Sequence, residues 1–366
     1  MDRAAPPGEG DAEGEGQAEA QVRAALAALI DADGTPLVSP AELSQVLLGE
    51  GWLAVVLGER RLPRERLAPL HAHLQRSFPD REIEIRSGSS VYRGGDGFGP
   101  RRHVLAVLGG KGGVGKSTVT VNLALTLSAM GLAVGVLDGD LNGPDIPHLL
   151  GVHPRDRTRR DWRLGAIRPP GQRHWPYQRW GLEVMSVGFI ASERAPLAAT
   201  GHWLVSGLLR NLLFDLNWRS EVIIIDAPPG TGDEIQVMVR ELPLSGAVFV
   251  TTPQDLAQMD AERTLSHLRE HGVPVIGMVH NMASLTCPHC TQAIDLYATS
   301  SRLEDAGVRI LGRIPFDTRL SVTADRGLPL VLGDPRGPVA LEFAHIAATV
   351  RRYLNDRDQA AQGRAA

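Results

Sequence analysis

The sequence is poor in cysteine, in aromatic residues and in net charge. Its 366 residues include two Cys and 5% aromatics, and 38 Lys and Arg stand against 42 Asp and Glu, a formal net charge of -4. Two cysteines exclude a disulfide framework, and the charge balance excludes a global field that holds nucleic acid or an acidic membrane surface. No uninterrupted apolar run reaches the roughly 18 residues that span a bilayer. We therefore expect a cytoplasmic protein with no nucleic-acid partner and no membrane partner.

Changes in composition predict two folded parts. Residues 1–20 are mostly Gly, Ala, Glu and Asp, which predicts a disordered tail, and the patterns of residues 21–87 predict a small α+β domain. Residues 88–102 are rich in Gly, which is typical of a linker. From 103 to 356, short apolar runs alternate with helical stretches, which predicts a doubly wound, mostly parallel α/β domain. Residues 357–366 are expected to form a polar tail.

The apolar runs of the second part predict seven strands that are covered on both faces. Consecutive rather than alternating apolar positions are typical of buried parallel strands. The seven runs are His103–Leu108, Ala133–Leu137, Leu182–Val187, Val222–Ile225, Ala247–Thr251, Val275–His280 and Ile310–Ile314. A last helical pattern, Val339–Leu354, places its apolar residues on one side, which predicts a helix packed on the core.

An insertion from His153 to Trp180 mixes eight Arg with three Trp and one Tyr. Arg and aromatic side chains together are typical of a surface that contacts nucleic acid or a partner. The same composition, with its Pro and Gly, is also typical of an exposed loop whose charges are solvated. The sequence favours the exposed loop, and the insertion does not decide the function.

A phosphate loop, residues 110–118, predicts nucleotide binding. It follows the strand 103–108, precedes a predicted helix and fits the pattern G-x-x-x-x-G-K-[ST] with Gly110, Lys111, Gly112, Gly113, Val114, Gly115, Lys116, Ser117 and Thr118. In this context glycines turn backbone N–H groups toward phosphate oxygens, and the helix N-terminus adds its dipole. Lys116 is then expected to neutralise the β- and γ-phosphates of ATP, and Ser117 to bind Mg²⁺. A glycine-rich turn without a ligand is the alternative.

Carboxylates end two of the predicted strands near this loop. Asp138 and Asp140 follow the second predicted strand. Asp226 directly follows the apolar strand Val222–Ile225, which is the Walker B pattern. Because the carboxyl ends of parallel strands share one edge of a sheet, we expect these side chains near the phosphates. Asp140 is the candidate for orienting the attacking water, and Asp138 and Asp226 are candidates for the Mg²⁺ shell. A helix N-cap is the alternative for Asp138 and Asp140.

Both cysteines lie in one run, Cys287-Pro-His-Cys290. The C-x-x-C spacing directs two thiolates at one ion, and thiolates select Zn²⁺, Cu(I) or iron–sulfur clusters. Two thiolates do not fill a tetrahedral zinc site or a four-iron cluster, and a two-fold dimer supplies the missing pair. A thioredoxin-type redox pair, a structural zinc site and buried unreactive cysteines are the alternatives.

The loop from Lys111 to Thr118 resembles the deviant Walker A loop of the MinD/ParA/nitrogenase-iron-protein class of ATPases. In that class the first lysine reaches across a dimer to the partner's nucleotide. The resemblance therefore implies a homodimer in which Lys111 contacts the ATP of the other subunit, the alternative being a surface lysine.

Further motifs resemble the Mrp/ApbC family of iron–sulfur cluster carrier ATPases. They are Asp226–Asp233, Thr251–Asp255, Asn281-Met282 before the cysteines, and Leu311–Pro315. The resemblance covers residues 103–330, and the small N-terminal domain is faintly similar to a SufT-like domain. It implies a [4Fe-4S] cluster bridged by Cys287 and Cys290 of two protomers, delivery to apo iron–sulfur proteins, slow ATP hydrolysis, and recognition of the adenine edge by Asn281. An asparagine that ends a strand is also typical of a turn.

Two other functions are open on the sequence. A MinD/ParA-like positioning switch acts on membrane or DNA and requires a basic amphipathic tail or a basic face, whereas Val339–Leu354 is patterned as a core helix. An electron-transferring reductase like nitrogenase iron protein places its two cluster cysteines far apart in sequence. The carrier function is therefore the leading hypothesis.

Overall fold

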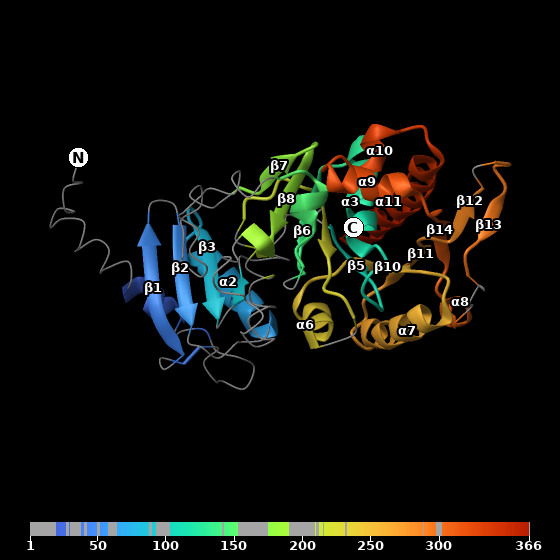
Figure 1. The fold of residues 1–366 in the computed structure, drawn as a ribbon. Coiled ribbons are helices and arrows are strands. Elements are labelled where there is room, and N and C mark those ends of the chain that lie inside the picture. The colour runs from blue at the N-terminus through green and yellow to red at the C-terminus, as the bar shows by residue number, and fades with distance from the viewer. Residues whose placement is uncertain are drawn as a thin grey trace, which may run out of the picture. The chain divides into compact units, whose positions relative to one another are not determined.

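The computed structural model resolves the chain into two compact units, one mainly before and one mainly after residue 101. The residues that it describes are 20–26, 29, 38–39, 42–49, 52–57, 64–87, 90–92, 103–140, 143–152, 175–189, 209, 212–214, 216–230, 233–287, 289–297 and 302–365. Figure 1 shows both units as a ribbon.

The described part of the first unit contains a four-stranded sheet, a helical segment at residues 20–26 and a longer helix (Figure 1). The strands follow in the order β1 (Leu43–Gly49), β2 (Trp52–Leu57), β3 (Glu82–Ser87) and β4 (Ser90–Tyr92). Helix α2, Arg64–Ser77, connects the parallel strands β2 and β3 and buries Leu67, Leu70 and Leu74. β4 pairs with β3 inside the segment 88–102, so part of the predicted linker belongs to the sheet. A three-residue strand is too short to show a periodic pattern in the sequence.

The second unit is built on an eight-stranded sheet in the order β14-β11-β10-β5-β9-β6-β8-β7. Its strands are β5 (His103–Leu108), β6 (Val134–Asp138), β7 (Tyr177–Arg179), β8 (Leu182–Ser186), β9 (Val222–Asp226), β10 (Gly246–Thr251), β11 (Val275–His280) and β14 (Ile310–Arg313). Neighbouring strands are parallel except at the edge, where β7 is antiparallel to β8. The predicted doubly wound, mostly parallel fold is confirmed, and each of the seven predicted strands begins and ends within one residue of its expected bounds.

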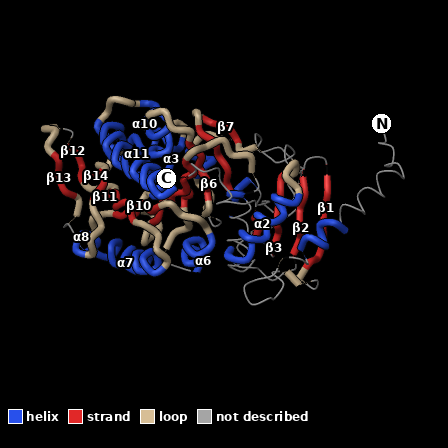
Figure 2. Tube along the Cα trace, turned by 180° about the vertical axis from the view of Figure 1, so that it is seen from behind, coloured by secondary structure: helices blue, strands red, loops and turns tan. Residues whose placement is uncertain are grey.

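Helices cover both faces of this sheet. Figures 1 and 2 show α3 (Lys116–Ala129) and α11 (Pro338–Ala365) on one face, and α6 (Asp233–Glu241) and α7 (Asp255–Glu270) on the other. The shorter elements are α4 (Ile146–Leu149), α8 (Arg302–Asp305), α9 (Thr318–Asp325), α10 (Leu330–Gly333), a 3-10 turn (Val187–Phe189) and the strands β12 (Ser284–Thr286) and β13 (Ala293–Asp295). No helix in the described ranges is long and apolar enough to cross a bilayer.

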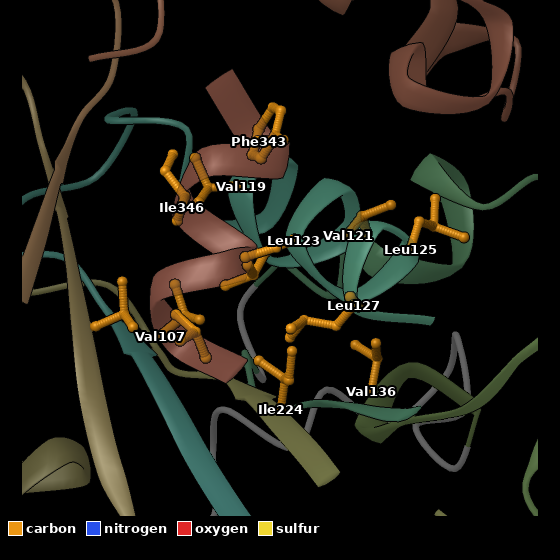
Figure 3. Close-up of a cluster of buried hydrophobic side chains, with 14 of the residues drawn as sticks. Val107, Val119, Val121, Leu123, Leu125, Leu127, Val136, Ile224, Phe343 and Ile346 are labelled. Atoms are coloured by element: carbon orange, nitrogen blue, oxygen red, sulfur yellow. The ribbon is translucent and has the colours of Figure 1, made fainter. Parts of the chain in front are cut away.

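Helix α3 lies at the centre of the main hydrophobic cluster. Its buried residues include Leu123 and Leu127, which Figure 3 shows with side chains from the sheet strands and from α11. The predicted core side of α11 is confirmed, since Phe343, Ile346, Ala347, Val350 and Leu354 are all buried. This helix continues to Ala365, so the described residues of the predicted polar tail are helical. These five side chains thus face the core, as the sequence pattern predicts.

Most of the predicted insertion, residues 153–174, lies outside the described residues. The end of the insertion is described, and there Trp175 and Trp180 are 49% and 42% exposed. Guanidinium groups cover them at 4.4 Å from the ring centres, Arg219 over Trp175 and Arg179 over Trp180. The indole N–H of Trp180 also donates to the carbonyl of Leu150 at 3.1 Å, so this end of the insertion is fixed on its own domain.

Candidate nucleotide site and cysteine hairpin

The phosphate loop connects the end of β5 to the start of α3. Gly113 and Gly115 have φ angles of 79° and 86°, a backbone conformation that residues other than glycine rarely adopt. Lys111, Gly112 and Gly113 are exposed at the tip of the loop. The loop thus presents backbone at the N-terminus of a 14-residue helix, which is the arrangement that binds anions.

Neighbouring elements fix the shape of the loop from two sides. A Cβ added to Gly110 would lie 2.3 Å from the backbone nitrogen of Ala261 in α7. On the other side, the buried amide of Asn281 donates from Nδ2 to the carbonyl of Val114 at 2.8 Å. The structure therefore places Asn281 against the loop backbone, and its predicted contact with adenine stays a prediction.

Asp226, at the end of β9, is the centre of a buried polar cluster behind the loop. Its carboxylate accepts hydrogen bonds from the hydroxyls of Ser117 at 2.6 Å and Thr120 at 2.9 Å, and Lys116 Nζ lies 3.7 Å from Oδ1. Burial raises the pKa of Asp226, while Lys116, Ser117 and Thr120 act in the opposite direction. The structure thus brings three predicted site residues together. Sequence reasoning missed Thr120, although its place one helical turn after Lys116 is a usable signal.

Asp138 ends β6 and lies opposite Asp226 in the register of β6 and β9. It is fully buried and accepts the hydroxyl hydrogen of Ser186 at 2.8 Å, a partner that the sequence did not predict. Burial, and then the nearby charge of Asp226, raise the pKa of Asp138 well above its usual value. Asp140 follows, and its carboxylate accepts the backbone N–H of Gly143 at 3.2 Å. The predicted convergence of carboxylates at this sheet edge is present.

The side chains at this edge fit Mg²⁺. Ser117 and Asp226 offer hard oxygen atoms, and the buried carboxylate of Asp226 lies beside the buried ammonium group of Lys116. Nowhere in the described ranges do three or more His, Cys, Asp or Glu residues form a group that could hold a metal ion by itself. Mg²⁺ suits such a site because it commonly keeps several waters and binds substrate phosphates beside one or two protein ligands.

The cysteines lie in the turn of a hairpin formed by β12 and β13, next to the β14 edge of the main sheet (Figure 1). Cys287 is half-buried, Cys290 is exposed, and both are free thiols. The backbone N–H groups of Cys290 and then His289 stabilise the Cys287 thiolate, which lowers the pKa of that thiol. The alternative of buried, unreactive cysteines is therefore wrong. Neither cysteine is buried, and thiolate is the form that binds metal.

Large apolar side chains are exposed around this hairpin. Ile294 and Leu296 are 49% and 38% exposed, and Phe316, which bridges to β12 through Leu285, is 44% exposed. Leu285 and Ile294 are paired in the hairpin register. We call Ile294, Leu296 and Phe316 the apolar rim of the cysteine hairpin. A rim of this kind suits contact with another protein.

Comparison with known proteins places the second unit in a family. Residues 101–351 match the ParA-type family described as NUBPL iron-transfer P-loop NTPase. The iron–sulfur cluster carrier protein of Pyrococcus abyssi is 40% identical over 261 residues, which are 70% of this chain and 88% of that protein. The carrier protein of Aquifex aeolicus is 37% identical over 261 residues, 70% of this chain and 69% of that protein. The iron–sulfur cluster transfer protein NUBPL of Dictyostelium discoideum is 35% identical over 257 residues, 69% of this chain and 77% of that protein.

Solved structures agree with this placement. A nucleotide-binding protein of Archaeoglobus fulgidus in complex with ADP is 33% identical with a TM-score of 0.53, and the match covers 66% of this chain and 91% of that one. The septum site-determining protein MinD of Pyrococcus horikoshii, complexed with Mg-ADP, is 22% identical with a TM-score of 0.52. The match covers 68% of this chain and 96% of the MinD chain, and at this identity it supports the fold only. The chain is thus a P-loop ATPase and belongs to the NUBPL iron-transfer P-loop NTPase family.

Proposed function

We propose that this protein is an ATP-dependent carrier of a [4Fe-4S] cluster, which it holds between two copies of the chain and delivers to apo iron–sulfur proteins in the cytoplasm. The observation that carries the proposal is the pair of accessible thiols, Cys287 and Cys290, in the turn of a hairpin beside an ATPase domain. The carrier names of the relatives support the same cargo.

The number of thiols supports a homodimer. A four-iron cluster commonly takes four thiolates, and the chain has two cysteines in all. A second copy related by a two-fold axis supplies the other pair. The apolar rim lies beside these cysteines and offers surface that such a dimer buries.

The same dimer serves the nucleotide. The phosphate loop and the cysteine hairpin both follow the carboxyl ends of parallel strands, β5 and β11, so they lie at one edge of the sheet. Lys111 is exposed at the tip of the loop, where its side chain is free to extend toward a nucleotide on the facing copy. Its role there remains a proposal that rests on the family resemblance.

ATP hydrolysis is proposed to be slow and to gate release of the cluster. Lys116 neutralises phosphate charge, Ser117 and Asp226 hold Mg²⁺ with Asp138 behind them, and Asp140 orients the attacking water. Mg²⁺ supplies charge stabilisation to the phosphates. The buried, mutually bonded side chains support this arrangement because they are positioned before the reaction begins.

Anaerobic reconstitution with ferrous iron and sulfide tests the proposal. The wild-type protein is expected to become a dimer with about four iron and four sulfide per dimer and to transfer them to an apo four-iron ferredoxin. Cys287→Ser and Cys290→Ser are expected to bind no cluster. Gln292→Ala, an exposed neighbour in the same turn, is the matched control and should behave as wild type. A monomer without iron under all nucleotide conditions would refute the proposal.

A further inference from the structure

The residue that follows β11 contacts the phosphate loop directly. Asn281 is 4% exposed, donates from Nδ2 to the carbonyl of Val114, and donates its own backbone N–H to the carbonyl of Thr251. The contact is tight, because a Cβ added to Gly115 would lie 2.2 Å from Nδ2 of Asn281. Any movement of the backbone between Val114 and Gly115 must therefore displace the Asn281 amide or break its hydrogen bond.

The next residue is held in an unusual conformation. Met282 has a φ of 54°, and its Cε lies 3.8 Å from the position of a Cβ on Gly115. In the described ranges, Trp180, Met282 and Thr291 are the non-glycine residues with positive φ. Two of these three flank the cysteines, Met282 at the base of the hairpin and Thr291 in its turn. Strained backbone of this kind persists only where the surroundings hold it in place.

Beyond Met282 the chain is anchored again. The N–H of Ala283 donates to the carbonyl of Ile314 at 2.9 Å, and the N–H of Phe316 donates to the carbonyl of Ser284 at 2.6 Å. These bonds attach the base of the cysteine hairpin to the segment after β14. Met282 is thus the junction between a residue fixed to the phosphate loop and a strand that leads to Cys287.

We propose that Asn281 is a positioning residue that couples the phosphate loop to the cysteine hairpin, with Met282 as the hinge, so that the bound nucleotide sets the reactivity of Cys287 and Cys290. The coupling rests on the proposed function only for its meaning in cluster transfer, because the contacts themselves hold without cargo. It also differs from adenine recognition. A coupling through the loop backbone responds equally to ATP and GTP analogues, which share their phosphates, whereas an adenine contact discriminates between them.

Thiol reactivity in the metal-free, full-length protein tests the coupling. The rate of modification of Cys287 and Cys290 by an aromatic disulfide reagent is measured with ADP and with a non-hydrolysable ATP analogue, each at a concentration that saturates the variant studied. In the wild type we expect the two nucleotide states to differ by about fivefold in rate. Asn281→Ala should reduce this ratio to nearly one. Met282→Gly, which relieves the strain and loosens the hinge, should reduce it as well.

Asn122 provides a matched control. Its Nδ2 donates to the carbonyl of Thr118, the last residue of the loop, at 2.8 Å, and its Oδ1 accepts the N–H of Val331 at 3.2 Å. It is thus a buried amide bonded to the loop, but it lies on α3 and leads to no cysteine. Asn122→Ala should therefore keep the nucleotide dependence of the thiols. Equal rates in the two states of the wild type, an unchanged ratio in both Asn281→Ala and Met282→Gly, or an equal loss in Asn122→Ala would each overturn the coupling. If cluster reconstitution fails while the thiol response persists, the proposed cargo is wrong and the coupling stands.

Discussion

The phosphate loop and the cysteine hairpin of this protein are built in opposite ways. The loop is enclosed by its own chain, with α7 against Gly110, Asn281 bonded to Val114, and Asp226 surrounded by partners. The hairpin consists of two strands of three residues each, its second strand is exposed throughout, and its thiols are free.

Under the proposed function, the first site takes most of its groups from one chain, whereas the second needs two further thiols from another copy. Enclosed donors are fixed before a ligand arrives, so they bind and stabilise charge without reorganising. The half-buried Cys287 and the exposed Cys290 lie on a small hairpin and leave room for ligands from another molecule. Under the proposed function, the same accessibility allows a bound cluster to be passed on. The comparison predicts that changes at the loop cost stability and catalysis, whereas changes at the hairpin affect assembly.

The largest expected effect is at Lys116, whose ammonium group is buried 3.7 Å from Asp226. Lys116→Met keeps most of the side-chain volume and removes the charge that is proposed to neutralise the phosphates. We expect ATP hydrolysis, measured as phosphate release, to fall by about 100- to 1,000-fold. A rate within tenfold of wild type would show that Lys116 is not central to hydrolysis.

Lys111→Ala, at the exposed tip, should change the free energy of unfolding by less than about 0.5 kcal/mol.

Three glycines of the loop form a graded series. A Cβ meets nothing within 4 Å at Gly112 or Gly113, but Gly113 has a positive φ, and Gly115 combines a positive φ with the close amide of Asn281. We expect the free energy of unfolding to fall by less than about 0.5 kcal/mol in Gly112→Ala, about 1 kcal/mol in Gly113→Ala and about 3 kcal/mol in Gly115→Ala. Urea denaturation without nucleotide measures the series, and equal losses would contradict an enclosed loop.

His280, the last residue of β11, is expected to make the free energy of unfolding depend on pH. Burial, and then the charge of Arg313, lower its pKa from 6.5 to about 4, so the folded state binds fewer protons than the unfolded state between these values. Its contribution to stability is therefore complete above pH 6.5 and is lost as the pH falls toward 4, by up to about 3 kcal/mol.

Substitution by a residue that does not titrate isolates this contribution. In His280→Gln the difference in unfolding free energy between about pH 7 and pH 4.5 should shrink relative to wild type. If the unfolding free energies of wild type and His280→Gln differ by the same amount at every pH in this range, His280 does not cause the pH dependence.

The smallest effect on the folded chain is expected at the apolar rim. Ile294→Ser changes a side chain that is 49% exposed, so the unfolding free energy should change by less than about 0.5 kcal/mol. The reconstituted dimer, however, should dissociate about tenfold more readily, because the rim loses apolar area. Val322→Ser on α9 is equally exposed, at 48%, and serves as the control in sedimentation experiments. Equal dimer stability in both variants would remove the rim from the interface.

The sequence predicts local features of this protein well and long-range contacts poorly. The seven strands are predicted because each buried run is apolar at consecutive positions, and the phosphate loop because its glycines and lysine are adjacent in sequence. The bond from Asn281 to Val114 joins residues 167 positions apart, and it forms because β11, β10 and β5 are neighbours in the sheet. The hydrogen bond from Ser186 to Asp138 likewise forms because β8 and β6 are neighbours in the sheet. No pattern within one segment contains such pairs.

The place of α11 in the core has a consequence for synthesis of the protein. This helix follows every other described element along the chain, yet Phe343 and Ile346 pack in the same cluster as Leu123 of α3. Until the residues beyond 338 have been synthesised, α3, which carries Lys116 and Ser117, lacks the side chains of α11 that pack against it. The cysteines have by then already been translated. Nascent chains should therefore contain both cysteines before α3, which carries the phosphate-loop lysine and serine, is fully packed in the core.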